Sequence, residues 1–142
     1  MRLLDVNILV YAHREDAPRH AEFRTWLQDL LAGDEPIALT SHVLSGFVRV
    51  VTHRRVFDPP TPLPAALEFA AVLRNHPTCV PIEPGARHWE IFADLCQEAN
   101  ARGNLIPDAQ LAATAIEAGC ELVSTDRDFA RFAGLRWSRP LD

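Results

Sequence analysis

Short apolar stretches alternate along this chain with longer amphipathic ones, and this alternation constrains the fold more than any other feature. The short stretches have the apolar content of buried strands, whereas the longer ones repeat apolar residues at helical spacing. A strand, a helix and a second strand in succession form a unit whose two strands run parallel. We therefore expect an α/β fold with a central parallel sheet that helices cover on both faces.

The expected elements follow from apolar periodicity and from residues that begin or end helices. The apolar run 2–10, with its polar notch, suits a buried parallel strand that has Asp5 at its carboxyl end. Pro18 and the apolar spacing after it indicate a helix that ends at Gly33, and Ser41 can cap the next helix. The other expected strands are 37–40, 78–82, 122–125 and 135–138. The other expected helices are 41–55, 64–75, 84–102, 108–118 and a brief one at 127–132.

Length and composition are typical of one globular domain. The 142 residues, 48% hydrophobic and 23% charged, suffice for one core and are few for two, so we expect a single domain over 1–142. No apolar run approaches the ~18 residues of a membrane span, and the N-terminal stretch lacks the regions of a signal peptide. We expect a cytoplasmic protein with no membrane partner. Cys79, Cys96 and Cys120 are widely spaced, which predicts reduced, buried thiols.

The charge of the chain bears on nucleic-acid binding in opposite ways. A net charge of −5 argues weakly against non-specific binding, which usually goes with an excess of basic residues. The densest basic cluster consists of Arg49, Arg54 and Arg55 with His53, near the end of one expected helix. These side chains could contact RNA phosphates or could interact favourably with the helix dipole, and the sequence leaves both readings open.

Three aspartates stand where an expected strand meets a helix or a loop: Asp5, Asp108 and Asp126. Asp128 follows two residues after Asp126. Most of these aspartates could have ordinary roles. Asp108 could cap a helix, and Asp126 and Asp128 could be turn residues. Asp5 is different, since a carboxylate inside an apolar strand is costly unless it is paired or bound to a cation.

The joint placement of these acids suggests a metal site. Ligands of parallel sheets bind beyond the carboxyl ends of the strands, where Asp5, Asp108 and Asp126 would meet. Their mutual repulsion would be offset by a hard divalent cation such as Mg²⁺, which prefers oxygen ligands. Such an ion lowers the pKa of a water molecule and stabilises charge at a phosphorus centre, so the pattern suggests phosphodiester chemistry.

Three blocks of sequence carry a family resemblance: LLDVNILVYA, LTSHVLSGFVRVVTHRRVF and NLIPDAQLAATAIEAGCELVSTDRDFARF. In this order and spacing they resemble a PIN-domain ribonuclease, and more narrowly the VapC toxins of type II toxin–antitoxin pairs. The resemblance implies a three-layer α/β/α domain and endonucleolytic cleavage of structured RNA such as tRNA or rRNA. It also implies dependence on Mg²⁺, with Mn²⁺ as a substitute, a VapB-type antitoxin as partner, and a homodimer.

The resemblance also assigns residues. Asp5, Asp108 and Asp126 match the acidic positions that would hold the metal and carry catalysis. Asp128 matches a more variable fourth acid, and Asn7 matches a polar residue near the first aspartate.

The central block departs from the family pattern at Gly46, where glutamate is usual. On a helix that begins at Ser41, a polar face that could meet the acidic pocket comprises His42, Gly46, Arg49 and His53. Glycine inside a helix costs about 1 kcal/mol relative to alanine and offers no ligand, so the sequence shows no advantage for it.

Three explanations of Gly46 remain open. The first is drift, in a protein whose remaining acids suffice or that has become inactive. The second is a change that disables a toxic ribonuclease. The third is that Glu83 or Glu90 supplies the missing oxygen.

Other functional classes find less support. No two of the six histidines stand three or four residues apart, which favours solvated histidines over a zinc site. No serine-hydrolase elbow, Walker A sequence or dinucleotide fingerprint is present. A phosphoacceptor domain of flavodoxin-like strand order would need a lysine in its pocket, and the chain has none. The main alternative to a nuclease is a PIN module that binds RNA and antitoxin without cleavage, and metal-dependent turnover would separate the two.

Overall fold

The structure, a computed structural model, describes residues 1–141 and contains a five-stranded sheet. The strands are β1 (Arg2–Leu4), β2 (Ile37–Leu39), β3 (Cys79–Pro81), β4 (Glu121–Val123) and β5 (Trp137–Ser138). Their order across the sheet is β3-β2-β1-β4-β5, and each neighbouring pair is parallel. The expected central parallel sheet is confirmed. Its order differs from the 2-1-3-4-5 order of flavodoxin-like proteins, which removes support from the phosphoacceptor alternative.

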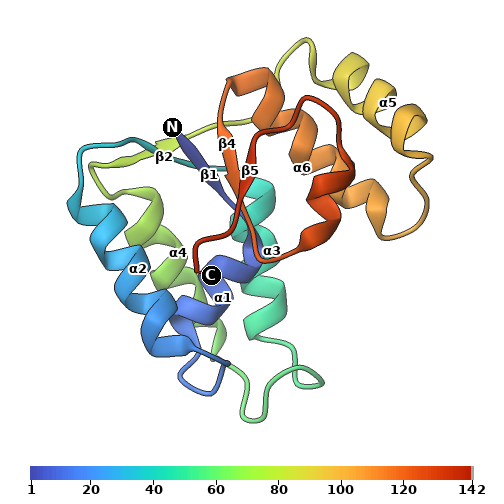
Figure 1. The fold of residues 1–142 in the computed structure, drawn as a ribbon. Helices are drawn as coiled ribbons and strands as arrows, with labels where there is room; N and C mark the ends of the chain where they lie inside the picture. Colours follow the sequence, from blue (N-terminus) through green and yellow to red (C-terminus); the bar gives the residue numbers. More distant parts are fainter. Residues whose placement is uncertain (142) are drawn as a thin grey trace.

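Helices cover the sheet in two groups. They are α1 (Val6–His13), α2 (His20–Ala32), α3 (Ser41–Val51), α4 (Leu63–Arg74), α5 (His88–Ala99) and α6 (Leu105–Ala118), with a short 3-10 helix η1 (Arg127–Arg131). Helix α5 packs on α6, whereas α1 packs on α2 and α3, and α3 on α4. Figure 1 shows α5 and α6 on one side of the strands and α2 and α4 on the other. The three-layer α/β/α architecture is therefore confirmed.

The core lies between the central strands and the helices. Leu3 and Leu4 of β1 and Leu122 and Val123 of β4 are each no more than 1% exposed. Helix α6 meets the sheet through an alanine-rich face that is fully buried. Small side chains there let the helix backbone lie close to the strands, so the start of α6 comes near the ends of β1 and β4.

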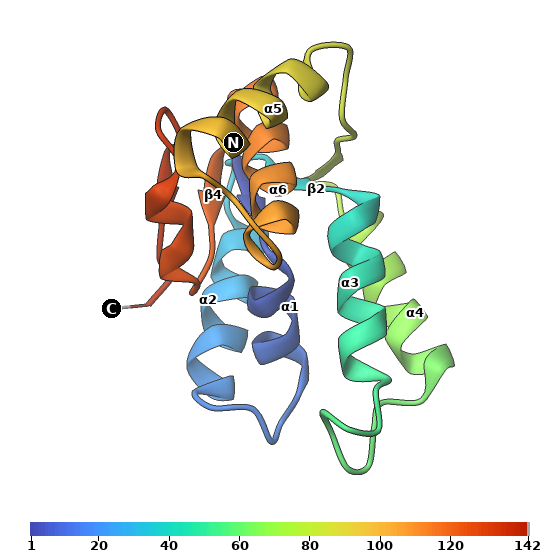
Figure 2. The ribbon, with the colours of Figure 1, turned by 90° about the vertical axis from the view of Figure 1, so that its right-hand side faces the viewer.

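The apolar run 2–10 is not one strand but a strand followed by a helix, so that prediction is wrong beyond Leu4. Asp5 separates the two elements, because its Oδ1 accepts a hydrogen bond of 2.7 Å from the Val6 amide and caps α1. Helix α1 is packed between α2 and α3, and Ile8, Leu9 and Val10 in succession are buried. A helix buried on several sides shows no amphipathic period, which explains the incorrect assignment. Figure 2 shows α1 and α3 extending past the carboxyl ends of the strands.

Several helix ends also differ from the expectation. The cap of α3 is Thr40, whose hydroxyl accepts from the Val43 amide at 3.0 Å, and the helix ends at Val51 rather than near residue 55. Helix α5 begins at His88 rather than at residue 84. Helix α6 begins at Leu105, so Asp108 lies in its first turn instead of opening it.

The thiols and histidines are only partly as expected. The three cysteines are free, but Cys120 alone is buried, while Cys79 and Cys96 are half-buried. The expectation of solvated histidines is wrong for His88, which is buried and whose Nε2 donates to the Gln110 carbonyl at 2.9 Å. Within residues 1–141, no helix combines the length and the apolar character that crossing a membrane requires.

Candidate metal centre

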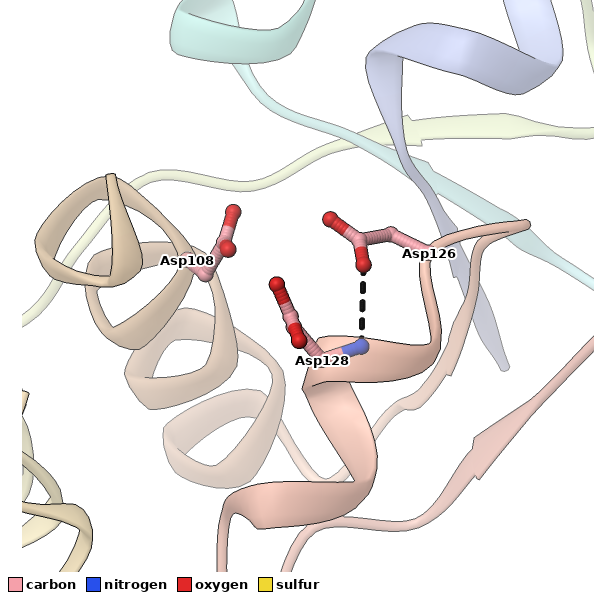
Figure 3. Close-up of side chains that lie close together, drawn as sticks. All are labelled: Asp108, Asp126 and Asp128. Atoms are coloured by element: carbon pink, nitrogen blue, oxygen red, sulfur yellow. Dashed lines mark hydrogen bonds between the residues drawn. The ribbon is translucent and has the colours of Figure 1, made fainter.

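Three carboxylates converge beyond the carboxyl end of β4. Asp108 comes from the first turn of α6, Asp126 from the loop after β4, and Asp128 from η1. One oxygen of each carboxylate lies within 4.8 Å of those of the other two. Figure 3 shows the three side chains pointing toward one another. The structure thus brings together two of the three predicted ligands, Asp108 and Asp126, and adds Asp128, which the sequence placed only as a variable fourth acid.

Asp5 stands beside these carboxylates rather than among them. Its Oδ1 accepts from the Val6 amide, and its Oδ2 accepts from the Ser124 hydroxyl at 2.7 Å and from the Asn7 amide group at 3.3 Å. Both oxygens are therefore fixed in orientation. Each carboxylate oxygen has two lone pairs, so Oδ1, with one protein hydrogen bond, keeps a lone pair with which it can still bind a cation.

Ser124 joins the two strand ends on which the acids lie. Its side chain is fully buried, and its hydroxyl donates to Asp5 while accepting from the Asp126 amide at 3.0 Å and from Asn7 at 3.3 Å. The sequence alone did not point to Ser124. The available signal was its position directly after the apolar strand and two residues before Asp126, where a hydroxyl can bridge neighbouring strand ends.

The positions of Asp126 and Asp128 depend on each other. The Asp126 carboxylate accepts a hydrogen bond of 2.9 Å from the Asp128 amide, and this interaction caps η1. A short aspartate side chain that binds the backbone two residues later forms a compact turn. The turn directs the Asp128 carboxylate toward Asp108, so one local motif supplies two of the converging groups.

The surroundings of Asp108 and Asp5 oppose the ionised state of these two carboxyl groups. Burial raises the pKa of Asp108 to about 6, and the charges of Asp126, Asp5 and Asp128 add to the effect. The pKa of Asp5 is also raised, chiefly by burial and in addition by Asp126, against the lowering effect of its bonds from Ser124 and Val6. Carboxylates that repel one another at neutral pH are stabilised by a cation.

The donor set fits a hard divalent ion. All of the converging ligand atoms are carboxylate oxygens, which suit Mg²⁺ and Mn²⁺ and are a poor match for zinc, whose sites are dominated by histidine and cysteine.

A cavity of about 280 Å³ opens next to the acids. Asp5 and Asp108 line one side, and α3 lines the other with His42, Gly46 and Arg49. The prediction that the polar face of α3 meets the acidic pocket is confirmed for these residues. His53, which was expected on the same face, lies beyond the end of α3 and is not part of the lining.

Gly46 has a packing role that the sequence did not show. A Cβ at this position would lie 2.9 Å from Cγ2 of Val6, closer than such atoms normally approach. Glycine therefore permits the close contact between α3 and α1. The geometry does not support replacement of the missing oxygen by Glu83, which accepts from the Ser41 amide and hydroxyl instead, or by Glu90, which lies exposed on α5; neither lines the cavity.

Comparison with known proteins places the chain in a family. Residues 2–135 match the model of the PIN domain. Ribonuclease VapC43 of Mycobacterium tuberculosis is 48% identical over 142 residues, which cover all of this chain and 97% of that protein. Ribonuclease VapC25 of the same species is 46% identical over 140 residues, which cover 99% of both. The crystal structure of VapBC2 from Rickettsia felis bound to a promoter DNA fragment has a chain that matches with a TM-score of 0.73 at 20% identity, over 97% of each chain. The chain therefore belongs to the PIN-domain family, and the VapC ribonucleases are among its relatives there.

Proposed function

We propose that this protein is a metal-dependent endoribonuclease that hydrolyses phosphodiester bonds in structured RNA, such as tRNA or rRNA. The convergence of Asp108, Asp126 and Asp128 beside Asp5 is the observation that carries the proposal. Membership of the PIN-domain family supports a nuclease, because relatives that span the whole chain are named ribonucleases.

In this proposal Asp5, Asp108 and Asp126 hold Mg²⁺ or Mn²⁺ and form the catalytic site, with Asp128 as an additional ligand. When bound, the ion supplies an activated water molecule and stabilises negative charge at phosphorus. Ser124 and Asn7 orient Asp5 through their hydrogen bonds to its Oδ2. Asp108, whose pKa is about 6, must be deprotonated before it can act as a ligand, so the site is competent at neutral pH.

The proposed biological role is that of a toxin in a type II toxin–antitoxin system, with a VapB-type antitoxin as partner and a homodimer as the assembly. The VapBC2 complex of Rickettsia felis supports this role, because the fold it shares with this chain is there combined with VapB. One observation favours a second candidate, an RNA- and antitoxin-binding module that does not cleave: Gly46 leaves α3 without a carboxylate at the cavity.

Incubation with total tRNA, with Mg²⁺ and with EDTA, tests the function. We expect cleavage products only with the metal, and a loss of products in Asp126→Asn. Asp29→Asn, which removes the same charge from the exposed surface of α2, is the matched control and should cleave like the wild type. RNA binding without any product in Mg²⁺ or Mn²⁺ would establish the non-cleaving module instead. Absence of both binding and cleavage would contradict both candidates.

A further inference from the structure

The cavity beside the acids has two sides of unlike chemistry. Asp5 and Asp108 make one side acidic. The other side is a face of α3 formed by His42, Ser45, Gly46 and Arg49. The last three of these residues stand three, four and seven positions after the first, so they share one face of the helix. We call these four residues the α3 face; its polar side chains carry donors and no carboxylate.

Two side chains of the α3 face are free to bind a ligand. Among residues 1–141, the Arg49 guanidinium and the His42 imidazole make no hydrogen bond or ion pair. Arg14, by contrast, binds Asp16. Arg49 lines the same cavity as two aspartates and yet pairs with neither of them. Its five donors therefore remain available to an anion that enters the cavity.

Gly46 keeps the middle of the α3 face open and uncharged. A glutamate there would stand three residues before Arg49 and four after His42, the two spacings at which helical side chains pair. Such a carboxylate would compete with any anion for both groups. With glycine in its place, the surface between His42 and Arg49 is bare backbone beside Val6.

We propose that the α3 face binds a phosphodiester group of the RNA substrate and holds it against the acidic side of the cavity. The inference rests on the proposed function and assigns substrate binding to residues outside the acidic cluster. The planar guanidinium of Arg49 matches two phosphate oxygens in a bidentate contact. The His42 imidazole and the Ser45 hydroxyl can each donate one further hydrogen bond. These donors offset the repulsion between a phosphate and the neighbouring aspartates, which explains how an acidic protein binds an acidic polymer here.

Metal-free RNA binding tests the proposal independently of cleavage. In EDTA, Arg49→Gln should raise the Kd for RNA by about tenfold and lower the slope of log Kd against log salt by about one ion. Arg49→Lys keeps the positive charge but loses the planar guanidinium that makes the bidentate contact. It should therefore have the salt slope of the wild type but only part of its affinity for RNA. Arg74→Gln is the matched control, because this exposed arginine ends α4 and is not among the residues that line the cavity. It should leave both quantities unchanged.

Parallel cleavage assays of the wild type with Mg²⁺ separate this inference from the proposed function. If the wild type cleaves RNA and Arg49→Gln binds RNA with the same affinity as Arg74→Gln, the inference is overturned. The proposed nuclease function is supported in that case. If the wild type binds without cleaving and Arg49→Gln loses affinity selectively, the inference is supported and the non-cleaving module is established. If the wild type neither binds nor cleaves RNA, both fail.

Discussion

Gly46 determines both how closely α3 approaches α1 and what α3 presents to the cavity. Any side chain at this position meets Val6, so Gly46→Ala and Gly46→Glu share the same steric cost. The gain of about 1 kcal/mol in helix propensity offsets part of that cost in each. A comparison of the two variants therefore isolates the effect of the carboxylate.

For this pair we expect opposite effects on binding and on turnover. Gly46→Glu should weaken metal-free RNA binding by about tenfold relative to Gly46→Ala, because its carboxylate pairs with Arg49 and repels phosphate. It should also raise the single-turnover rate of cleavage with Mg²⁺, because it adds an oxygen ligand next to Asp5 and Asp108. Equal rates for the wild type and both variants would remove any catalytic meaning from position 46.

The raised pKa of Asp108 predicts a pH dependence of stability in the metal-free protein. Between its ordinary value of 3.8 and the folded value of about 6, the folded state binds more protons at this group than the unfolded state does. The contribution of Asp108 to the free energy of unfolding must then decrease as pH rises through this window, and it stays low above pH 6. Asp108→Asn lacks the titration and should be more stable than the wild type at pH 7.

Urea denaturation of both proteins in EDTA from pH 4 to pH 7 measures this effect. The difference between the two free energies of unfolding isolates Asp108 from the other acids. Curves that run parallel over the whole range would show that Asp108 has an ordinary pKa and that the carboxylates do not repel one another as described.

At the scale of secondary structure, the start of α3 depends on Thr40. This residue is 2% exposed, and its hydroxyl satisfies the Val43 amide in the first turn. Thr40→Ala should lower the free energy of unfolding by about 1 kcal/mol, and Thr40→Ser, which keeps the hydroxyl, by much less. Ser41→Ala should also have a small effect, since Ser41 is exposed and its hydroxyl donates to Glu83. Thermal unfolding ranks the three variants by stability. An equal loss of stability in all three would contradict the assignment of Thr40 as the cap of α3.

Periodicity predicted the existence and order of the elements but not all of their ends. The division of the run 2–10 at Asp5 depends on a hydrogen bond to the next amide, which an apolar pattern does not encode. The late start of α5 has a distant cause, because the Glu117 carboxylate on α6 accepts from the Gly85 and Arg87 amides and holds that segment as a loop. Local sequence therefore could not show that residues 84–87 are outside the helix.

The candidate site was predictable to a different degree for each residue. Position after a strand selected Asp5 and Asp126, whereas Asp108, which lies in the first turn of α6 and follows no strand, was selected as a residue at a helix start and by the family resemblance. Position along the chain did not identify Asp128 as a main ligand, because the direction of its side chain is set by the turn that Asp126 caps. It gave no reason to select Ser124, because a serine after a strand becomes informative only when the neighbouring strand is known. The close contact of Gly46 with Val6 likewise exists only between two folded helices.

At the scale of the whole molecule, the site and the fold depend on each other. The hydrogen bond from Ser124 to Asp5 joins residues 119 positions apart, and it forms because β1 and β4 are neighbours in the sheet. An unfolded chain cannot present this arrangement of carboxylates. Binding of a divalent ion to the site is consequently coupled to folding, and the ion should stabilise the folded protein as a whole.

This coupling predicts opposite effects of one substitution with and without metal. At a Mn²⁺ concentration of about 100 times its Kd, the wild type should gain about 2.7 kcal/mol and roughly 5–10 °C in Tm. Asp126→Asn should lose most of this gain, yet in EDTA it should melt above the wild type, because it removes a charge that raises the pKa of both Asp108 and Asp5. Asparagine can still cap η1, so the fold around Asp128 is kept. Asp29→Asn should respond to Mn²⁺ like the wild type. If Asp126→Asn instead melts below the wild type in EDTA and keeps the full metal response, the converging carboxylates neither repel one another nor hold the ion.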